Sequence, residues 1–137
     1  MAKKSKEMEV AVADVVNFLK ISGRFEPALR EVVVRKVTAE KARKQGLKVS
    51  KQKLQKAADA FRLMHGLNKA SQTEAWLKAN GLTLEALEVY LEENLLINAF
   101  KDNLVKKAAK TKLYNSAPVK ETMREIVYQR WLNKTVK

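Results

Sequence analysis

Few residues of this 137-residue sequence combine the types and spacing that catalysis or metal binding requires. The single histidine, His65, stands at the end of a predicted helix, where an imidazolium complements the helix dipole. Cysteine is absent, which excludes a thiolate nucleophile and, with only one histidine, the usual zinc sites. Glu92 and Glu93 are the one adjacent acidic pair in the sequence. Consecutive helical residues diverge by about 100°, so these two do not make a carboxylate dyad by themselves.

The glycine spacing also excludes a phosphate-binding loop. The four glycines lie at least fifteen residues apart, and neither a GxGxxG nor a Walker pattern occurs. The sequence therefore predicts a protein that is not an enzyme and needs no cofactor and no metal. We expect a binding module.

The charge of the chain is large and unevenly distributed. Lysine and arginine total 28 against 15 acidic residues, a net charge of +13. Residues 1–69 carry a net of +10, residues 70–100 a net of −4 and residues 101–137 a net of +7. A basic protein of this kind favours acidic partners, although the same charge can also serve only to keep the surface solvated.

Basic side chains are densest on a predicted helix over residues 25–45. The expected partner is an acidic polypeptide or a peptide-modifying enzyme, and nucleic acid is an alternative because a basic stripe contacts phosphates. No zinc-finger, basic-zipper or RNA-recognition pattern supports that alternative. The residues predicted to contact the acidic partner are Arg30, Arg35, Lys36, Arg43 and Lys44.

Apolar periodicity predicts six helices, over residues 10–21, 25–45, 51–65, 71–80, 84–111 and 118–133. Each glycine falls where a helical pattern stops, and Ser50, Thr83 and a capping box from Ser71 to Glu74 mark helix starts. The β-branched residues near Val10 leave a short strand there as an alternative. We expect residues 1–9 to be a disordered basic terminus and residues 10–137 to be one domain.

Aromatic and methionine side chains recur at spacings that suit either a core or a binding surface. A helical domain of this size does not bury all of them easily, and a groove lined by some of them suits an extended peptide. The residues predicted to contact such a peptide are Phe61, Met64, Leu67, Trp76, Leu77, Tyr90, Phe100, Tyr128 and Trp131.

Three stretches carry a family resemblance: the run Gly46-Leu-Lys-Val-Ser50, the segment from Leu54 to Leu67, and the segment from Thr73 to Leu87. With this spacing, residues 10–105 resemble the N-terminal helical domain of SurA-like chaperones and parvulin-type peptidyl-prolyl isomerases. Within that group they resemble in particular cytoplasmic bacterial proteins associated with the maturation of ribosomally synthesised peptides.

The resemblance implies a compact orthogonal bundle of five to six helices that holds unfolded or extended polypeptide. One long central helix and a C-terminal helix that completes the bundle are expected. The isomerase domain of the family would begin near Leu113, and the remaining residues leave no room for it, so proline isomerisation is not expected. Unlike SurA, the chain has no signal peptide or membrane-spanning stretch, and a cytoplasmic location is expected.

One alternative makes the chain itself a substrate. The helical domain would then be a large leader recognised by a peptide-modifying enzyme, and Tyr114 to Lys137 would be the processed part. The sequence alone does not separate this hypothesis from a peptide-binding, chaperone-like module. The oligomeric state is open.

Overall fold

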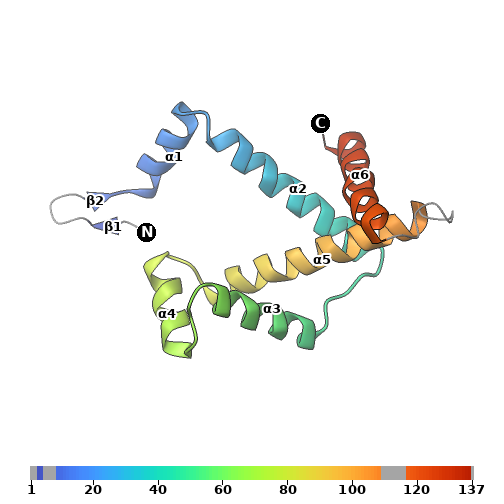
Figure 1. Cartoon of the computed structure of the whole chain (residues 1–137). Helices are drawn as coiled ribbons and strands as arrows, with labels where there is room; N and C mark the ends of the chain where they lie inside the picture. Colours follow the sequence, from blue (N-terminus) through green and yellow to red (C-terminus); the bar gives the residue numbers. More distant parts are fainter. Residues whose placement is uncertain (1–2, 5–8, 109–116, 137) are drawn as a thin grey trace.

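A computed structural model describes residues 3–4, 9–108 and 117–136 (Figure 1). Within these residues the fold is helical, and the expected all-α class is confirmed. The helices are α1 (Val12–Ile21), α2 (Phe25–Lys44), α3 (Lys51–Met64), α4 (Ala70–Ala79), α5 (Leu84–Ala108) and α6 (Ala117–Thr135). Each predicted helix therefore exists, with ends within about two residues of the expected ones wherever the chain is described.

The N-terminus contains a short antiparallel ladder. β1 (Lys3–Lys4) pairs with β2 (Glu9–Val10), with Lys3 opposite Val10. Paired extended residues of this kind satisfy one another's backbone groups, and the pairing agrees with the alternative of a short strand at Val10. The expected disorder of residues 1–9 stays a prediction. Residues 1–2 and 5–8 lie outside the described residues.

Local capping explains most helix boundaries. The Ser50 hydroxyl accepts a hydrogen bond from the Lys53 N–H at 3.2 Å, and the Thr83 hydroxyl accepts one from the Ala86 N–H at 3.1 Å, so both predicted caps are confirmed. Gly46 adopts a φ of 81°, which lets the chain turn back at the end of α2 without a Cβ clash.

The start of α4 differs from the prediction. The capping box from Ser71 to Glu74 does not form, since α4 begins at Ala70 and its N-cap is Lys69. The Gln72 side chain accepts a hydrogen bond from the Lys69 N–H at 2.9 Å, so Gln72 takes the place expected for Glu74.

Two hydrophobic clusters hold the helices together, and α5 takes part in both. The larger cluster joins α2, α5 and α6 through Ala39, Ala42, Leu96, Ile97, Phe100, Tyr128 and Leu132. The smaller cluster joins α4 and α5 through Leu77, Leu87 and Leu91, with Leu54, Ala57, Ala58 and Phe61 of α3 packed against it. In Figure 1, α5 accordingly lies between α3 and α4 on one side and α2 and α6 on the other. The long central helix and the completing C-terminal helix are as expected.

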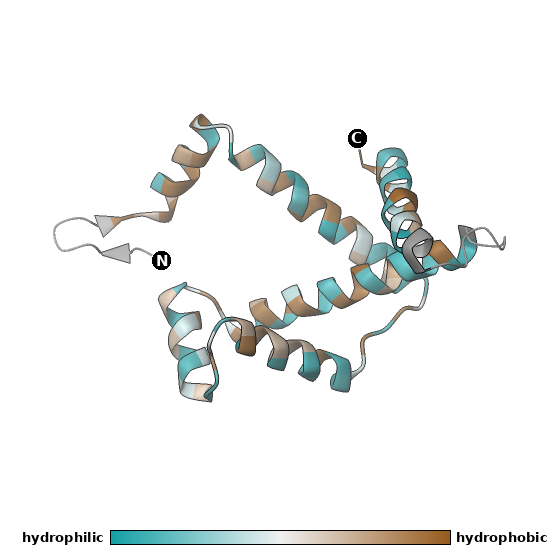
Figure 2. Cartoon of the chain, in the orientation of Figure 1, coloured by the Kyte–Doolittle hydropathy of each residue, from teal (hydrophilic) through white to brown (hydrophobic). Residues whose placement is uncertain are grey.

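Helix α1 and the first half of α2 lie outside both clusters. In Figure 1 they project from the rest of the molecule, and α1 packs mainly against α2. Figure 2 shows that hydrophobic residues are frequent along this projection. We call residues 10–33 the arm. No helix in the described part of the chain has the length and hydrophobicity needed to cross a membrane.

Candidate functional site

A groove with a hydrophobic floor runs over α3, α4 and α5. It consists of two hollows of about 520 and 610 Å³ that share Arg62, Thr73 and Leu84 as lining residues, so the two lie next to each other. The first hollow is lined by Lys51, Leu54, Gln55, Ala58, Arg62, Thr73, Leu84, Leu87, Glu88 and Leu91. The second is lined by Arg62, Ala70, Thr73, Glu74, Leu77, Lys78, Leu82 and Leu84. We call this surface the α3–α4–α5 groove.

The floor of the groove follows from helical spacing on α5. Leu84, Leu87 and Leu91 recur at three and four residues and therefore face one side of the helix. Leu87 and Leu91 are buried, whereas Leu84, the first residue of α5, is 53% exposed. The side of the groove that holds Leu84 is thus open to a partner.

The rim of the groove carries both signs of charge. Lys51, Arg62 and Lys78 contribute cations, while Glu74 and Glu88 contribute carboxylates. Arg62 is held in place by Asp59, and the pKa of the Asp59 carboxyl is lowered by the hydrogen bonds that it accepts from Arg62 and Gln55. Such a site can bury apolar side chains while polar groups at its edge bond to a peptide backbone or to charged neighbours.

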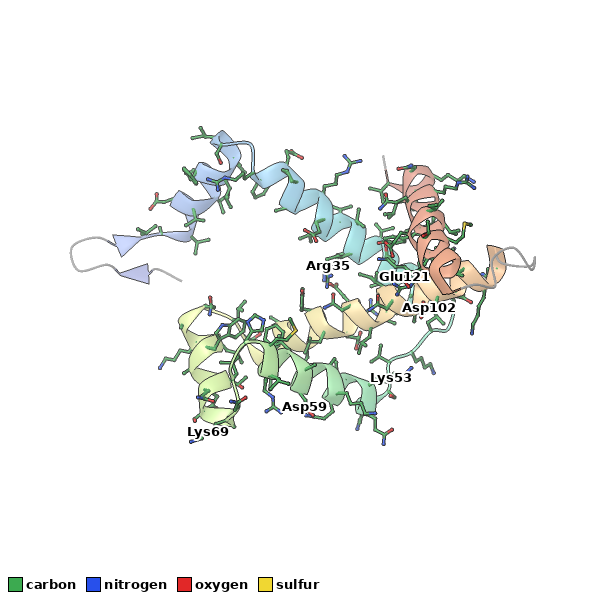
Figure 3. All side chains as sticks on the ribbon, in the orientation of Figure 1. Arg35, Lys53, Asp59, Lys69, Asp102 and Glu121 are labelled. Carbon is green, nitrogen blue, oxygen red and sulfur yellow. The ribbon has the colours of Figure 1, made fainter. Side chains whose placement is uncertain are left out.

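The predicted contact cations on α2 have partners within the chain. The Arg35 guanidinium donates to the Asn94 side chain at 2.7 Å and lies 3.5 Å from the Glu93 carboxylate, which also pairs with Lys36. Figure 3 shows Arg35 pointing from α2 toward α5. Arg43 pairs with Glu92 at 2.8 Å.

These pairs give the two adjacent glutamates a structural role that the sequence did not reveal. Glu92 and Glu93 neutralise the side of α2 that packs on α5, and Glu93 is only 5% exposed. Lys44 pairs with Glu40 of its own helix, so it too has a partner within the chain. Of the five predicted cations, Arg30 alone makes no ion pair or hydrogen bond with the described residues.

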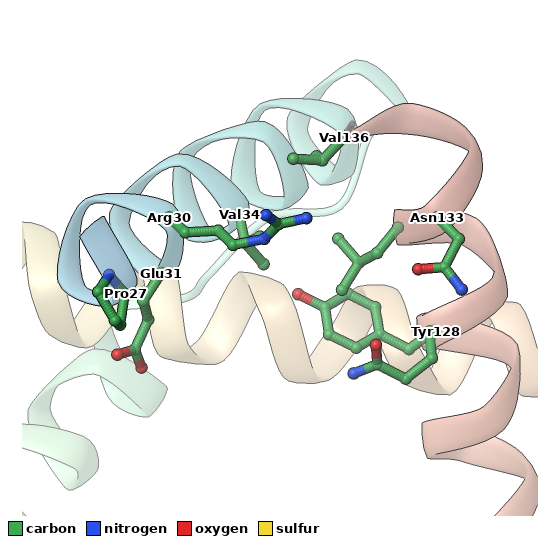
Figure 4. Close-up of a pocket in the computed structure, with 9 residues that line it drawn as sticks. Pro27, Arg30, Glu31, Val34, Tyr128, Asn133 and Val136 are labelled. Atoms are coloured by element: carbon green, nitrogen blue, oxygen red, sulfur yellow. The ribbon is translucent and has the colours of Figure 1, made fainter. Parts of the chain in front are cut away.

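Arg30 lines a separate hollow of about 380 Å³ between α2 and α6 (Figure 4). The Tyr128 side chain forms part of its wall, and the Tyr128 hydroxyl lies 3.0 Å from the Thr38 hydroxyl. The Thr38 hydroxyl donates to the Val34 carbonyl at 2.8 Å, so Tyr128 is the donor in the bond between the two hydroxyls. This chain of bonds fixes α6 on α2.

The structure distributes the predicted peptide-contact residues over several places. Leu77 lines the α3–α4–α5 groove, and Tyr128 lines the hollow between α2 and α6. Leu67 is buried and Phe100 is fully buried, so direct contact with a peptide is corrected to a packing role for these two. The rings of Phe61 and Trp76 pack together, and Trp131 packs on Phe100. The last two members of the predicted set, Met64 and Tyr90, are exposed.

The groove residues that sequence reasoning missed belong to helical stripes that were interpreted as core. Leu54 and Leu84 have the same spacing signal as buried leucines, and Arg62 gave no signal of its own. His65 stacks on Phe61 with ring centroids 4.1 Å apart. Among the described residues, no group of histidine, aspartate and glutamate side chains is arranged to hold a metal ion.

Comparisons with protein-family models, curated proteins and solved structures gave no significant match to this chain.

Because the Tyr128 hydroxyl is buried, we expect the fold to lose stability at alkaline pH. Burial raises the pKa of this hydroxyl, and the charge of Glu125 adds to the increase. Since the pKa is higher in the folded chain, the stability that neutral Tyr128 contributes is complete below about pH 10 and is lost as the pH rises above it. Tyr128→Phe is expected to remove this dependence.

The measurement is urea-induced unfolding of the unmodified protein and of Tyr128→Phe, at neutral pH and at about pH 11. At neutral pH the variant should be less stable by about 1 kcal/mol, because one buried hydrogen bond is lost. That deficit should shrink at the alkaline pH. A deficit that is the same at both pH values would contradict the prediction.

Proposed function

We propose that this chain is a non-catalytic, chaperone-like module that binds an extended segment of another polypeptide in the α3–α4–α5 groove. The observation that carries the proposal is that the two hollows adjoin at Arg62, Thr73 and Leu84, which line both of them. Each hollow has a volume within the range of about 300–1,000 Å³ that is usual for ligand sites. Two such hollows in series suit a chain with several side chains better than they suit one small molecule.

The chemistry of the lining favours a peptide with apolar side chains. Leucines and alanines from three helices form the floor, and they contribute binding energy in proportion to the apolar area they bury. The rim supplies the hydroxyl of Thr73 and the amide of Gln55, which can bond to backbone groups of an extended chain. The resemblance to SurA-like domains supports the same class of ligand. A role in the maturation of ribosomally synthesised peptides, in the cytoplasm of a bacterium, is part of this proposal.

Two alternatives receive less support. Nucleic-acid binding by the stripe on α2 is disfavoured because Arg35, Lys36 and Arg43 already pair with carboxylates of α5. Processing of Tyr114 to Lys137 as the product part of a precursor is disfavoured because α6 contributes Tyr128 and Leu132 to the larger hydrophobic cluster. Release of α6 would expose that cluster to water.

The groove is tested by replacing Leu84 with aspartate. Leu84 is 53% exposed at the start of α5, where a carboxylate also favours the helix dipole, so the fold should be retained. A charge on the apolar floor is expected to weaken peptide binding at least about tenfold, since it must be desolvated when a peptide covers it. The measurement is fluorescence anisotropy with labelled extended peptides rich in apolar residues.

Ile126→Asp is the matched control, because Ile126 is 41% exposed on α6 and lines neither hollow of the groove. This control is expected to bind as the unmodified protein does. The proposal would be abandoned if no extended peptide bound, or if the two variants lowered the affinity equally.

A further inference from the structure

The arm exposes more apolar side chains than is usual for a surface that faces only water. Helix α1 has apolar residues at every position except Asp14, Asn17 and Lys20, which recur at intervals of three and form a single polar stripe. A helix that is apolar over most of its circumference is ordinarily covered on several sides. Nevertheless α1 has no buried residue, and α2 is the main element against which it packs.

The exposed apolar side chains of the arm continue from α1 onto the first half of α2. Ile21 is 88% exposed and Phe18 is 58% exposed, and the other members of the set are between 36 and 53% exposed. The set comprises Val10, Val12, Val15, Phe18, Ile21, Leu29, Val32 and Val33. On α1 the exposed members follow one another at intervals of three residues and therefore spread round about half of the helix, so one partner covers only part of the set.

The charge of the arm differs from that of the whole chain. Asp14, Glu26 and Glu31 balance Lys20, Arg24 and Arg30, so residues 10–33 carry no net charge although the chain carries +13. Two copies of a protein with a net charge of +13 repel each other overall. The arm is a region where two copies can approach without that repulsion.

The area of the arm suits a small homodimer interface. A fully exposed side chain of this kind presents roughly 60–120 Å² of apolar surface, so the eight at their present exposure offer at most on the order of 400 Å². Homodimer interfaces are about 65% apolar, so this apolar area corresponds to a total buried area of roughly 600 Å² per partner. A stable protein–protein interface usually buries about 800 Å² per partner. Such an interface predicts a dimer of moderate affinity that dissociates on dilution.

We propose that the arms of two copies of this chain pack face to face about a two-fold axis and form a homodimer. The two-fold arrangement lets each arm cover the other with the same surface. The α3–α4–α5 groove lies on other elements and stays open in both copies. The dimer therefore presents two grooves, but its existence does not depend on their function.

The test is the mass of the full chain in solution, measured by light scattering and sedimentation over a wide range of concentrations. The mass is expected to rise from 15.6 kDa toward twice that value as the concentration increases. Ile21→Asp is expected to weaken the association at least about tenfold, because the interface would then have to desolvate two carboxylates. Since Ile21 is 88% exposed, this variant should keep its helical content.

Ile126→Asp provides the control for a charge added to an exposed apolar position outside the arm. Because the chain has no cysteine, a spin label at Ser22→Cys gives a second readout: one narrow distance between copies, absent when Ile21→Asp is also present. A monomeric mass at every concentration would overturn the proposal, as would a dimer that Ile21→Asp leaves intact. A monomer whose peptide binding is lost in Ile21→Asp would assign the arm to polypeptide instead and would equally overturn it.

The two proposals can fail separately. Leu84→Asp is expected to change peptide binding without changing the mass, and Ile21→Asp is expected to change the mass without changing binding in the groove.

Discussion

Replacing Phe100 with alanine is expected to lower the free energy of unfolding by about 3–5 kcal/mol. Phe100 is fully buried where α2, α5 and α6 meet, and its ring packs edge-on against Trp131 with centroids 4.8 Å apart. Truncation removes the apolar contacts of the ring and leaves a cavity that three helices border. Since Trp131 belongs to α6, the loss should also loosen the attachment of that helix.

Urea denaturation followed by circular dichroism measures this effect, and tryptophan fluorescence reports on α6 through Trp131 and on α4 through Trp76. Val89→Ala is the control, because Val89 lies on the same helix but is 47% exposed. Its cost should stay near about 0.5 kcal/mol, as is usual for surface positions. A loss below about 1 kcal/mol for Phe100→Ala would show that the larger cluster does not depend on this ring.

Replacing Glu93 with glutamine is expected to cost about 2–4 kcal/mol of stability. The Glu93 carboxylate is buried and pairs with both Arg35 and Lys36. The neutral amide cannot satisfy two cations, and Arg35 would be left partly buried beside Tyr90, whose ring centroid lies 4.6 Å from its guanidinium carbon. Chemical denaturation at neutral pH is the measurement.

The neighbouring residue supplies a matched control for this prediction. Glu92 carries the same charge and also pairs with a cation of α2, but its side chain is 40% exposed. Exposed ion pairs contribute at most about 1 kcal/mol, so Glu92→Gln should be mild. Equal losses for the two variants would mean that burial does not distinguish these glutamates.

Local signals in the sequence predicted the helices well. Ser50 and Thr83 cap the helices that they were expected to cap, because an N-cap depends on residues within one turn. The cap of α4 was misassigned because Lys69 is not a residue type that marks an N-cap, whereas Ser71 and Glu74 match the capping-box pattern. In the structure only the Gln72 half of such a box forms, as the bond that Gln72 accepts from the Lys69 N–H.

The candidate site was harder to predict because it depends on which helices are neighbours. The periodicity of Leu84 and Leu87 places both on one face of α5, but it does not tell which of the two a neighbouring helix covers. The sequence predicted that the basic stripe on α2 contacts a partner molecule. In the structure, Glu92 and Glu93 of α5 pair with cations of this stripe. Phe100 and Leu67 were assigned to a peptide site for the same reason, since burial is a tertiary property.

The sharing of α5 by two hydrophobic clusters has a consequence for how the molecule opens. Within the described residues, the clusters have separate members, and α3 and α4 belong only to the smaller one. We therefore expect two cooperative units joined by one helix, of which the unit with the smaller cluster is the weaker. Transient detachment of the weaker unit separates α3 and α4 from α5 while α2 and α6 stay in place. The groove lies on the unit with the smaller cluster, so we expect it to open more readily than the contacts among α2, α5 and α6.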